Sequence, residues 1–235
     1  MVSLPFTHRT RVTRLQHLQV TDRHVLHQVL DGGLVAHVGL VRRGMAVVLP
    51  VGYARDQDSM LLHGSTGSGL LREAARGAPL TATVTLLDGL VYARSLFDSS
   101  MNYRTAVVYG TAVPIEGTAK VAALRLLSDH LMPGRWGEVR EPTGRELAAT
   151  LVLRLPLTEV SVKLRAAGTE SAPDDGEDRT VWAGVLPLAL AAGMPIADPD
   201  VPTGLPVPTS VTAARTRHRG AAPGNVADST PPEHG

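Results

Sequence analysis

Apolar and polar residues alternate along several short stretches of the chain, and this two-residue period is typical of β-strands. In the clearest stretch, Leu80–Leu87, threonines occupy one face while Ala, Val and Leu occupy the other. Runs rich in Val and Leu predict further strands at 34–41, 45–51, 60–63, 106–115, 147–155 and 159–166. Short strands separated by turn residues indicate a mainly β protein and argue against a doubly wound parallel sheet.

An Asp-Gly pair at 88–89 directly follows the clearest strand, and 90–97 is again rich in apolar residues. Between two apolar runs, Asp-Gly favours a two-residue hairpin turn, because both central residues then need a positive φ. We therefore expect 90–97 to return antiparallel to 80–87.

Three stretches have the three- and four-residue spacing of amphipathic helices. The first begins at Thr21-Asp22 and ends at Gly32-Gly33, the second covers 67–76, and the third runs from about 117 to 131. With few helices among many strands, we expect a β-barrel with flanking helices.

The chain divides into three parts by composition. Residues 1–20 form an irregular, basic N-terminal extension, 21–194 form one folded domain, and 195–235 form a Pro-rich tail. The tail has too little apolar surface to offset the entropy of ordering it, so we expect it to be disordered. Its basic cluster at 215–219 is either a solvated stretch or a weak docking site for an acidic partner.

Composition excludes several classes of function. The chain has no cysteine, which excludes disulfides, thiolate catalysis and cysteine-ligated metals. Lys and Arg number 23 against 22 Asp and Glu, and no basic stripe is interleaved with aromatics, so we expect no nucleic-acid partner. No signal peptide and no run of about 18 apolar residues occurs, which predicts a cytoplasmic protein without a membrane partner. His24 and His27 share a helical spacing but lack a third ligand, so we expect no metal site.

The segment His-Gly-Ser-Thr-Gly-Ser-Gly at 63–69 lies between a predicted strand and a predicted helix. Its glycines let the backbone approach an anion, its hydroxyls donate hydrogen bonds, and the helix directs free N–H groups toward it. It has neither the Walker lysine nor the spacing of the dinucleotide fingerprint or the nucleophile elbow. Two interpretations remain open, a phosphate site and a helix cap without a ligand.

Two other segments have unusual composition for their position. Val47–Tyr53 contains Pro50, which predicts a strand edge or bulge whose free backbone groups can pair with a flat heterocycle, or else the end of the strand. Asp98–Thr105 concentrates polar side chains after the predicted hairpin, and as a plain connecting loop it needs no function.

Taken in order, these segments resemble the flavin-nucleotide-binding branch of the pyridoxamine 5′-phosphate oxidase-like split-barrel proteins. The resemblance is carried by Leu-Pro-Val-Gly-Tyr at 49–53, His-Gly-Ser-Thr-Gly-Ser at 63–68, Leu-Asp-Gly-Leu-Val-Tyr-Ala-Arg-Ser at 87–95 and Ser-Met-Asn-Tyr-Arg at 100–104. Pro-Gly-Arg-Trp at 133–136, Ser-Val-Lys-Leu-Arg at 161–165 and Val-Trp-Ala-Gly-Val-Leu-Pro at 181–187 fit the same branch. The resemblance covers about residues 10–190, most of the chain.

The resemblance implies a six-stranded antiparallel FMN-binding split barrel that forms a homodimer, with a flavin mononucleotide in each groove between subunits. It implies that 48–51 line the flavin ring, that Tyr53 stacks near this ring, and that 63–66 and Ser68 hold the phosphate. It also implies that 102–104 lie near the groove and reach the partner's flavin, and that Lys163, Arg165 and Trp182 close the site from the C-terminal side. The implied cofactor-binding residues are Val48, Leu49, Pro50, Val51, Tyr53, His63, Gly64, Ser65, Thr66, Ser68, Arg72, Asn102, Tyr103, Arg104, Lys163, Arg165 and Trp182.

One position departs from the pattern of this branch, whose members often have a basic residue where this chain has Gly69. A phosphate without a nearby cation binds less tightly, because charge-assisted hydrogen bonds are about twice as strong as neutral ones. Arg72, one helical turn further on, is the expected replacement.

The resemblance implies an FMN-dependent oxidoreductase, in which the flavin carries out the redox chemistry and the protein supplies position and electrostatics. One alternative is a non-catalytic protein that binds flavin, deazaflavin or haem, and haem would need an axial ligand such as His63 or His37. Another is an interaction protein with an empty groove. No catalytic residue is assigned, and the sequence names neither a substrate nor an electron donor.

Overall fold

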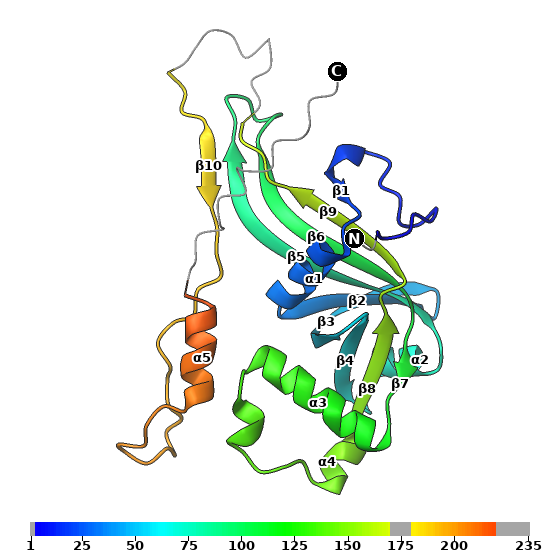
Figure 1. Cartoon of the computed structure of the whole chain (residues 1–235), viewed down its shortest axis with the longest axis vertical. Coiled ribbons are helices and arrows are strands. Elements are labelled where there is room, and N and C mark those ends of the chain that lie inside the picture. Colours follow the sequence, from blue (N-terminus) through cyan, green and yellow to red (C-terminus); the bar gives the residue numbers. More distant parts are fainter. Residues whose placement is uncertain (1–2, 170–179, 220–235) are drawn as a thin grey trace.

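The computed structural model describes residues 3–169 and 180–219, which form one large antiparallel sheet with helices packed outside it (Figure 1). The strands are β1 (Gln19–Val20), β2 (Val35–Arg42), β3 (Met45–Asp56), β4 (Ser59–Ser65), β5 (Pro79–Tyr92), β6 (Ser100–Thr111), β7 (Val113–Pro114), β8 (Thr150–Pro156), β9 (Glu159–Arg165) and β10 (Gly184–Pro187). Their order in the sheet is β1-β9-β6-β5-β2-β3-β4-β8-β7, and β10 pairs with β5. The mainly β class with flanking helices is confirmed.

The described sheet has ten strands, more than the six that the resemblance implied. Part of the difference comes from three strands of two to four residues, β1, β7 and β10, at its margins. The α-helices are α1 (Arg23–Gly32), α2 (Gly69–Ala75), α3 (Gly117–Leu131), α4 (Gly144–Ala149) and α5 (Thr209–Arg217), with short 3-10 helices η1 (Gln16–Leu18) and η2 (Arg135–Gly137). Across 3–169 and 180–219, no helix combines the length and the apolar character needed to cross a bilayer.

The barrel interior is filled by the apolar face of the alternating strands together with one side of α1. Leu26, Val29 and Leu30 of α1 are fully buried there, as the helical spacing predicts. The Asp22 side chain accepts a hydrogen bond from the His24 backbone N–H at 2.8 Å and so caps the helix at its predicted start. On the other face of β3, β4 and β8, α3 covers a second apolar cluster.

The predicted hairpin at Asp88-Gly89 is wrong. Strand β5 continues through both residues to Tyr92, neither residue has a positive φ, and the register with β6 shifts between Leu87 and Gly89. Asp88 is thus the extra residue of a β-bulge. Its carboxylate accepts two hydrogen bonds from Arg104 on β6, at 2.6 and 2.8 Å. The chain reverses at 93–99, so the expected return strand 90–97 does not form.

The upper parts of β5 and β6 therefore extend beyond the barrel as a two-stranded arm, and β10 lies along one edge of it (Figure 1). We call residues 85–105 the arm. Gly89 permits this close approach, because a Cβ there would lie 3.0 Å from the Leu186 carbonyl oxygen. At the arm tip, the Ser95 hydroxyl donates to the Asp98 carboxylate at 2.6 Å, and the Asp98 N–H donates back to the Ser95 hydroxyl.

The expectation of a disordered tail from residue 195 is wrong for the stretch that forms α5. The backbone N–H and the hydroxyl of Ser210 both donate to the Glu138 carboxylate, at 2.9 and 2.5 Å. These two bonds lower the pKa of Glu138. Arg217 donates to the His130 carbonyl oxygen at the end of α3. Residues 220–235 of the predicted tail lie outside the described residues.

Candidate functional site at the split of the barrel

Strand β3 changes its pairing partner from β2 to β4 partway along its length. It pairs with β2 from Met45 to Gly52, but with β4 only from Tyr53 to Asp56. Strand β4 instead pairs with β8 along its full length. One edge of β3 from 45 to 52 therefore has no strand partner within the described chain. We call this region, together with residues 63–69 that follow on β4, the split.

Pro50 lies on this unpaired edge, opposite His37 of β2. The interpretation of Pro50 as an edge residue is confirmed, and the alternative that the strand ends there is wrong. Val48 and Leu49 are 59% and 42% exposed, whereas Val51 is partly buried against the barrel core. The predicted ring-lining residues thus combine a strand edge with free backbone groups and two exposed apolar side chains, which point to opposite faces of the strand.

His63 stands at the point where β3 and β4 diverge, and it is partly buried. Its Nδ1 lies 3.2 Å from the carbonyl oxygen of Gly52. Because a carbonyl oxygen only accepts, Nδ1 carries the hydrogen and Nε2 keeps its lone pair in the neutral ring. A Cβ on Gly52 would lie 3.5 Å from His63 Cε1 and 3.3 Å from Leu131 Cδ1, so glycine lets the ring and the end of α3 pack closely.

The backbone N–H groups of residues 66–68 all have hydrogen-bond partners. The Ser65 hydroxyl accepts from the Gly67 N–H at 3.0 Å, the Ser65 carbonyl accepts from the Ser68 N–H, and the Thr66 N–H donates to the Ala149 carbonyl. The Ser68 hydroxyl caps α2 by accepting from the Leu71 N–H. The structure therefore confirms that Ser68 caps α2, and an anion here would meet hydroxyl groups and a cation rather than the three loop amides.

The glycine at position 64 has a packing role. A Cβ there would overlap Leu71 Cδ1, so the residue lets α2 close the end of the barrel. This contact explains the glycine without a ligand.

The cation next to the loop comes from a residue that sequence reasoning missed. Arg42, the last residue of β2, places its guanidinium over Gly69, where a Cβ would lie 2.6 Å from Nη1 and 2.8 Å from Cζ. Its Nε donates to Glu73 at 2.8 Å. The expected replacement, Arg72, is exposed on α2, and no hydrogen bond or ion pair joins its side chain to another described residue.

A tight turn fixes the position of Arg42. Arg43 and Gly44 both have positive φ, 51° and 80°, as a two-residue hairpin turn between β2 and β3 requires. The strand therefore ends at a defined point beside α2. The contact between Arg42 and Gly69 joins segments far apart in sequence, so no local sequence motif predicts it.

Tyr53 does not face a cofactor. Its side chain is fully buried, its hydroxyl donates to the Leu30 carbonyl at 2.5 Å, and its ring lies 5.4 Å from that of His130. Burial, with a smaller contribution from Asp31, raises its pKa. The expectation that Tyr53 stacks near the flavin ring is wrong, because β3 turns this side chain into the barrel.

The remaining predicted residues lie on the arm side of the sheet, and most have partners there. Asn102 accepts from Arg165 at 3.1 Å and donates to the Ala167 carbonyl at 2.9 Å. The hydrogen bonds from Arg104 to Asp88 raise the pKa of Arg104. Tyr103 pairs with Arg165 across β6 and β9, and Lys163 is opposite Thr105. Trp182 is 67% exposed, with its ring 6.0 Å from that of Tyr92.

One subunit does not bring the two groups of predicted residues together. Strands β5 and β2 lie between β6 and β3, which separates the groups by about 14 Å at ordinary strand spacing. Residues of the arm can meet the split only if they come from a second copy of the chain.

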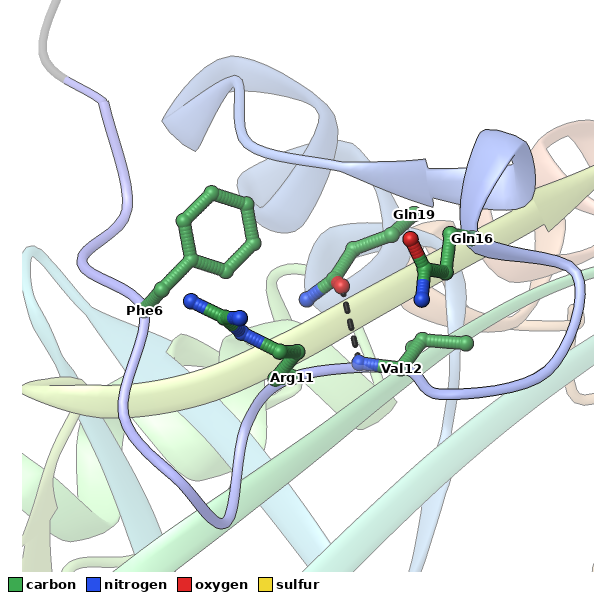
Figure 2. A pocket seen from close by; sticks show the side chains of 5 residues that line it. All are labelled: Phe6, Arg11, Val12, Gln16 and Gln19. Atoms are coloured by element: carbon green, nitrogen blue, oxygen red, sulfur yellow. Dashed lines mark hydrogen bonds between the residues drawn. The ribbon is translucent and has the colours of Figure 1, made fainter.

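A small pocket of about 270 Å³ lies elsewhere, at the N-terminal extension (Figure 2). Its lining residues are Phe6, Arg11, Val12, Gln16 and Gln19. The Gln19 amide accepts from the Val12 N–H at 2.9 Å and donates to the Thr10 carbonyl at 2.8 Å. These bonds fold the extension back on itself beside β1, so we interpret the pocket as part of its packing.

Comparison with known proteins defines the class to which this fold and site belong. Residues 22–164 match the family described as pyridoxamine 5′-phosphate oxidase, and the chain belongs to this family. The family is flavin-binding, and the split-barrel assignment made from the motifs is confirmed. No curated protein matches the chain.

Two solved structures are similar over most of this chain. The FAD and haem binding protein from Mycobacterium smegmatis is 44% identical, with a TM-score of 0.81, and the match covers 84% of this chain and 97% of that one. The flavocytochrome Anf3 from Azotobacter vinelandii is 32% identical, with a TM-score of 0.82, and the match covers 88% of this chain and 96% of that one.

Proposed function

We propose that this chain is an oxidoreductase that binds both a flavin and a haem and acts as a homodimer. The observation that carries the proposal is the split, where the free edge of β3, the hydroxyls of 65–68 and the anchored imidazole of His63 adjoin one another. The two similar structures support it, because one is described as binding FAD and haem and the other as a flavocytochrome.

The flavin ring is proposed to lie against the free edge of β3. Unpaired backbone N–H and C=O groups seek partners, and the flat ring edge of a flavin carries both donors and acceptors. Val48 and Leu49 supply exposed apolar contact beside them. We propose FAD in place of the FMN that the resemblance implied, because the 44% identical protein is described as binding FAD.

Haem is proposed to bind through His63. A histidine that ligates a metal usually donates its other ring N–H to a carbonyl or carboxylate, which fixes the ring. Nδ1 of His63 already donates to Gly52, which leaves Nε2 as the ligand. His37 is exposed on β2, and no hydrogen bond within the described residues orients its ring. When bound, flavin supplies two-electron chemistry and haem one-electron chemistry.

The homodimer is proposed because six of the seventeen predicted residues, Asn102, Tyr103, Arg104, Lys163, Arg165 and Trp182, lie on the arm side of the sheet, away from the split. The arm tip supports this, since Leu96 and Phe97 are 95% and 94% exposed on a turn that hydrogen bonds hold in place. Burying two such side chains against a partner contributes about 1.5–3 kcal/mol each.

Replacing Leu96 and Phe97 together by aspartate is expected to dissociate the dimer, because two charges would then enter an apolar contact. Sedimentation measures the mass of the full-length protein, and circular dichroism checks that the barrel is intact. Thr212→Asp, an exposed change on α5, is the matched control and should leave the mass unchanged. An unaltered dimer in the arm variant would show that the tip does not contact the partner.

Anaerobic reduction of the purified holoprotein tests the activity. We expect a nicotinamide donor to bleach the flavin absorption and then to shift the haem bands. Dithionite, a chemical reductant, should reduce both cofactors in the absence of any nicotinamide. Reduction by dithionite alone, with no response to NADH or NADPH, would favour the non-catalytic flavin or haem carrier over the oxidoreductase.

A further inference from the structure

The guanidinium of Arg42 occupies space that exists only because residue 69 is glycine. Three of its atoms, Nη1, Cζ and Nη2, lie 2.6 to 2.8 Å from where a Cβ of residue 69 would be. Any side chain at that position would have to move the guanidinium aside. Positions 42 and 69 are therefore coupled, although they lie on different elements.

Most of the hydrogen-bonding capacity of Arg42 is unused. A guanidinium has five N–H donors, and only the Nε–H is committed, to Glu73 at 2.8 Å. Nη1 and Nη2 form no hydrogen bond within residues 3–169 and 180–219. The side chain is 39% exposed, so a ligand can reach these donors. The bond to Glu73 meanwhile holds the guanidinium in place beside Gly69, the residue that follows the loop 65–68.

We propose that Arg42 is the cation that binds the flavin phosphate, supplied by β2 in place of a basic residue at position 69. This inference rests on the proposed flavin site. We assign the phosphate to the guanidinium because the backbone amides of residues 66–68 already donate hydrogen bonds to other groups. An arginine at either position 42 or position 69 can then bind the phosphate. Glycine is required at position 69 only when Arg42 is the residue that binds it.

The test compares the affinity of the full-length apoprotein for FMN, FAD and riboflavin, measured by quenching of flavin fluorescence. Riboflavin has the same ring but no phosphate. Arg42→Gln is expected to weaken FMN and FAD binding about tenfold to hundredfold, the value of a hydrogen bond to a charged group, and to leave riboflavin binding unchanged. Arg72→Gln tests the neighbouring exposed cation that the resemblance implied, and we expect it to bind like the parent. Arg76→Gln, which removes an exposed arginine at the end of the same helix, is the matched control.

The double variant Arg42→Gln with Gly69→Arg supplies the cation from the other position and is expected to recover most of the lost FMN affinity. Gly69→Arg alone should bind FMN within a few-fold of the parent, since the displaced tip of Arg42 is flexible. Thermal unfolding of each variant checks the fold.

Several outcomes would overturn the inference while leaving the flavin site intact. These are an unchanged FMN affinity in Arg42→Gln, an equal loss for FMN and riboflavin, or no recovery in the double variant. A loss in Arg72→Gln instead would assign the role to Arg72. A parent protein that binds none of the three flavins would refute the proposed function itself, and this inference with it.

Discussion

The His63→Ala variant is expected to lose its haem while it retains its flavin. The variant removes the imidazole whose Nδ1–H is fixed by the Gly52 carbonyl and whose Nε2 is left free. Loss of a haem ligand abolishes stable binding, whereas loss of a hydrogen bond that only orients a ligand costs about 10-fold to 100-fold in affinity. The measurement is the Soret absorption relative to protein, with the flavin quantified after release.

His37→Ala is the matched control, because this histidine lies on the neighbouring strand opposite Pro50. It should keep the Soret band. If His37→Ala loses the band and His63→Ala keeps it, the ligand is His37 and the assignment at the split is wrong. Retained flavin in both variants would show that each is folded.

Replacing Tyr53 with alanine is expected to be the most destabilising single change at the site. The ring is fully buried between the barrel core and His130, and its removal leaves a cavity. Large-to-small changes of buried aromatics cost about 3–5 kcal/mol of unfolding free energy. Tyr53→Phe removes only the hydroxyl and leaves the Leu30 carbonyl without this partner, at about 1–3 kcal/mol.

Chemical denaturation of the apoprotein measures both losses. Tyr92→Ala provides the control, since this tyrosine is 44% exposed on the arm and should cost far less. Equal losses for Tyr53→Ala and Tyr92→Ala would contradict the buried position, and would revive the expectation that Tyr53 faces a ligand.

The spacing of apolar residues along the sequence correctly predicted the regular elements, namely an amphipathic helix and a strand with alternating faces. Helix α3 has the bounds that its spacing predicts, 117 to 131. The strand at Leu80–Leu87 buries its Ala and Val face, as its alternation requires. By the same alternation Tyr53 shares a face with Val51, which packs on the core, so its burial was readable from the sequence.

Long-range contacts account for what the patterns did not predict. Asp88-Gly89 has the composition of a hairpin turn, but Arg104 and the approach of β10 hold it in a bulge instead. Helix α5 is held to the fold by Glu138 and by the His130 carbonyl, neither of which its own sequence reveals.

The site was predicted unevenly for a similar reason. The motifs located Pro50, His63 and the loop that follows, which lie together at the split. They did not reveal Arg42, because its contact with Gly69 depends on how β2 and α2 pack. The residues on the arm were grouped with the split by family resemblance, yet one chain holds them apart, and only a second copy would unite them.

The most direct test of the account is the cofactor content of the protein purified from cells, measured by absorption and then by release and chromatography. We expect flavin and Soret absorption in the same protein, with FAD as the released flavin. Released FMN or deazaflavin would correct the identity of the cofactor and keep the site. A colourless protein that takes up neither added flavin nor added haem would contradict the account and favour an interaction protein with an empty groove.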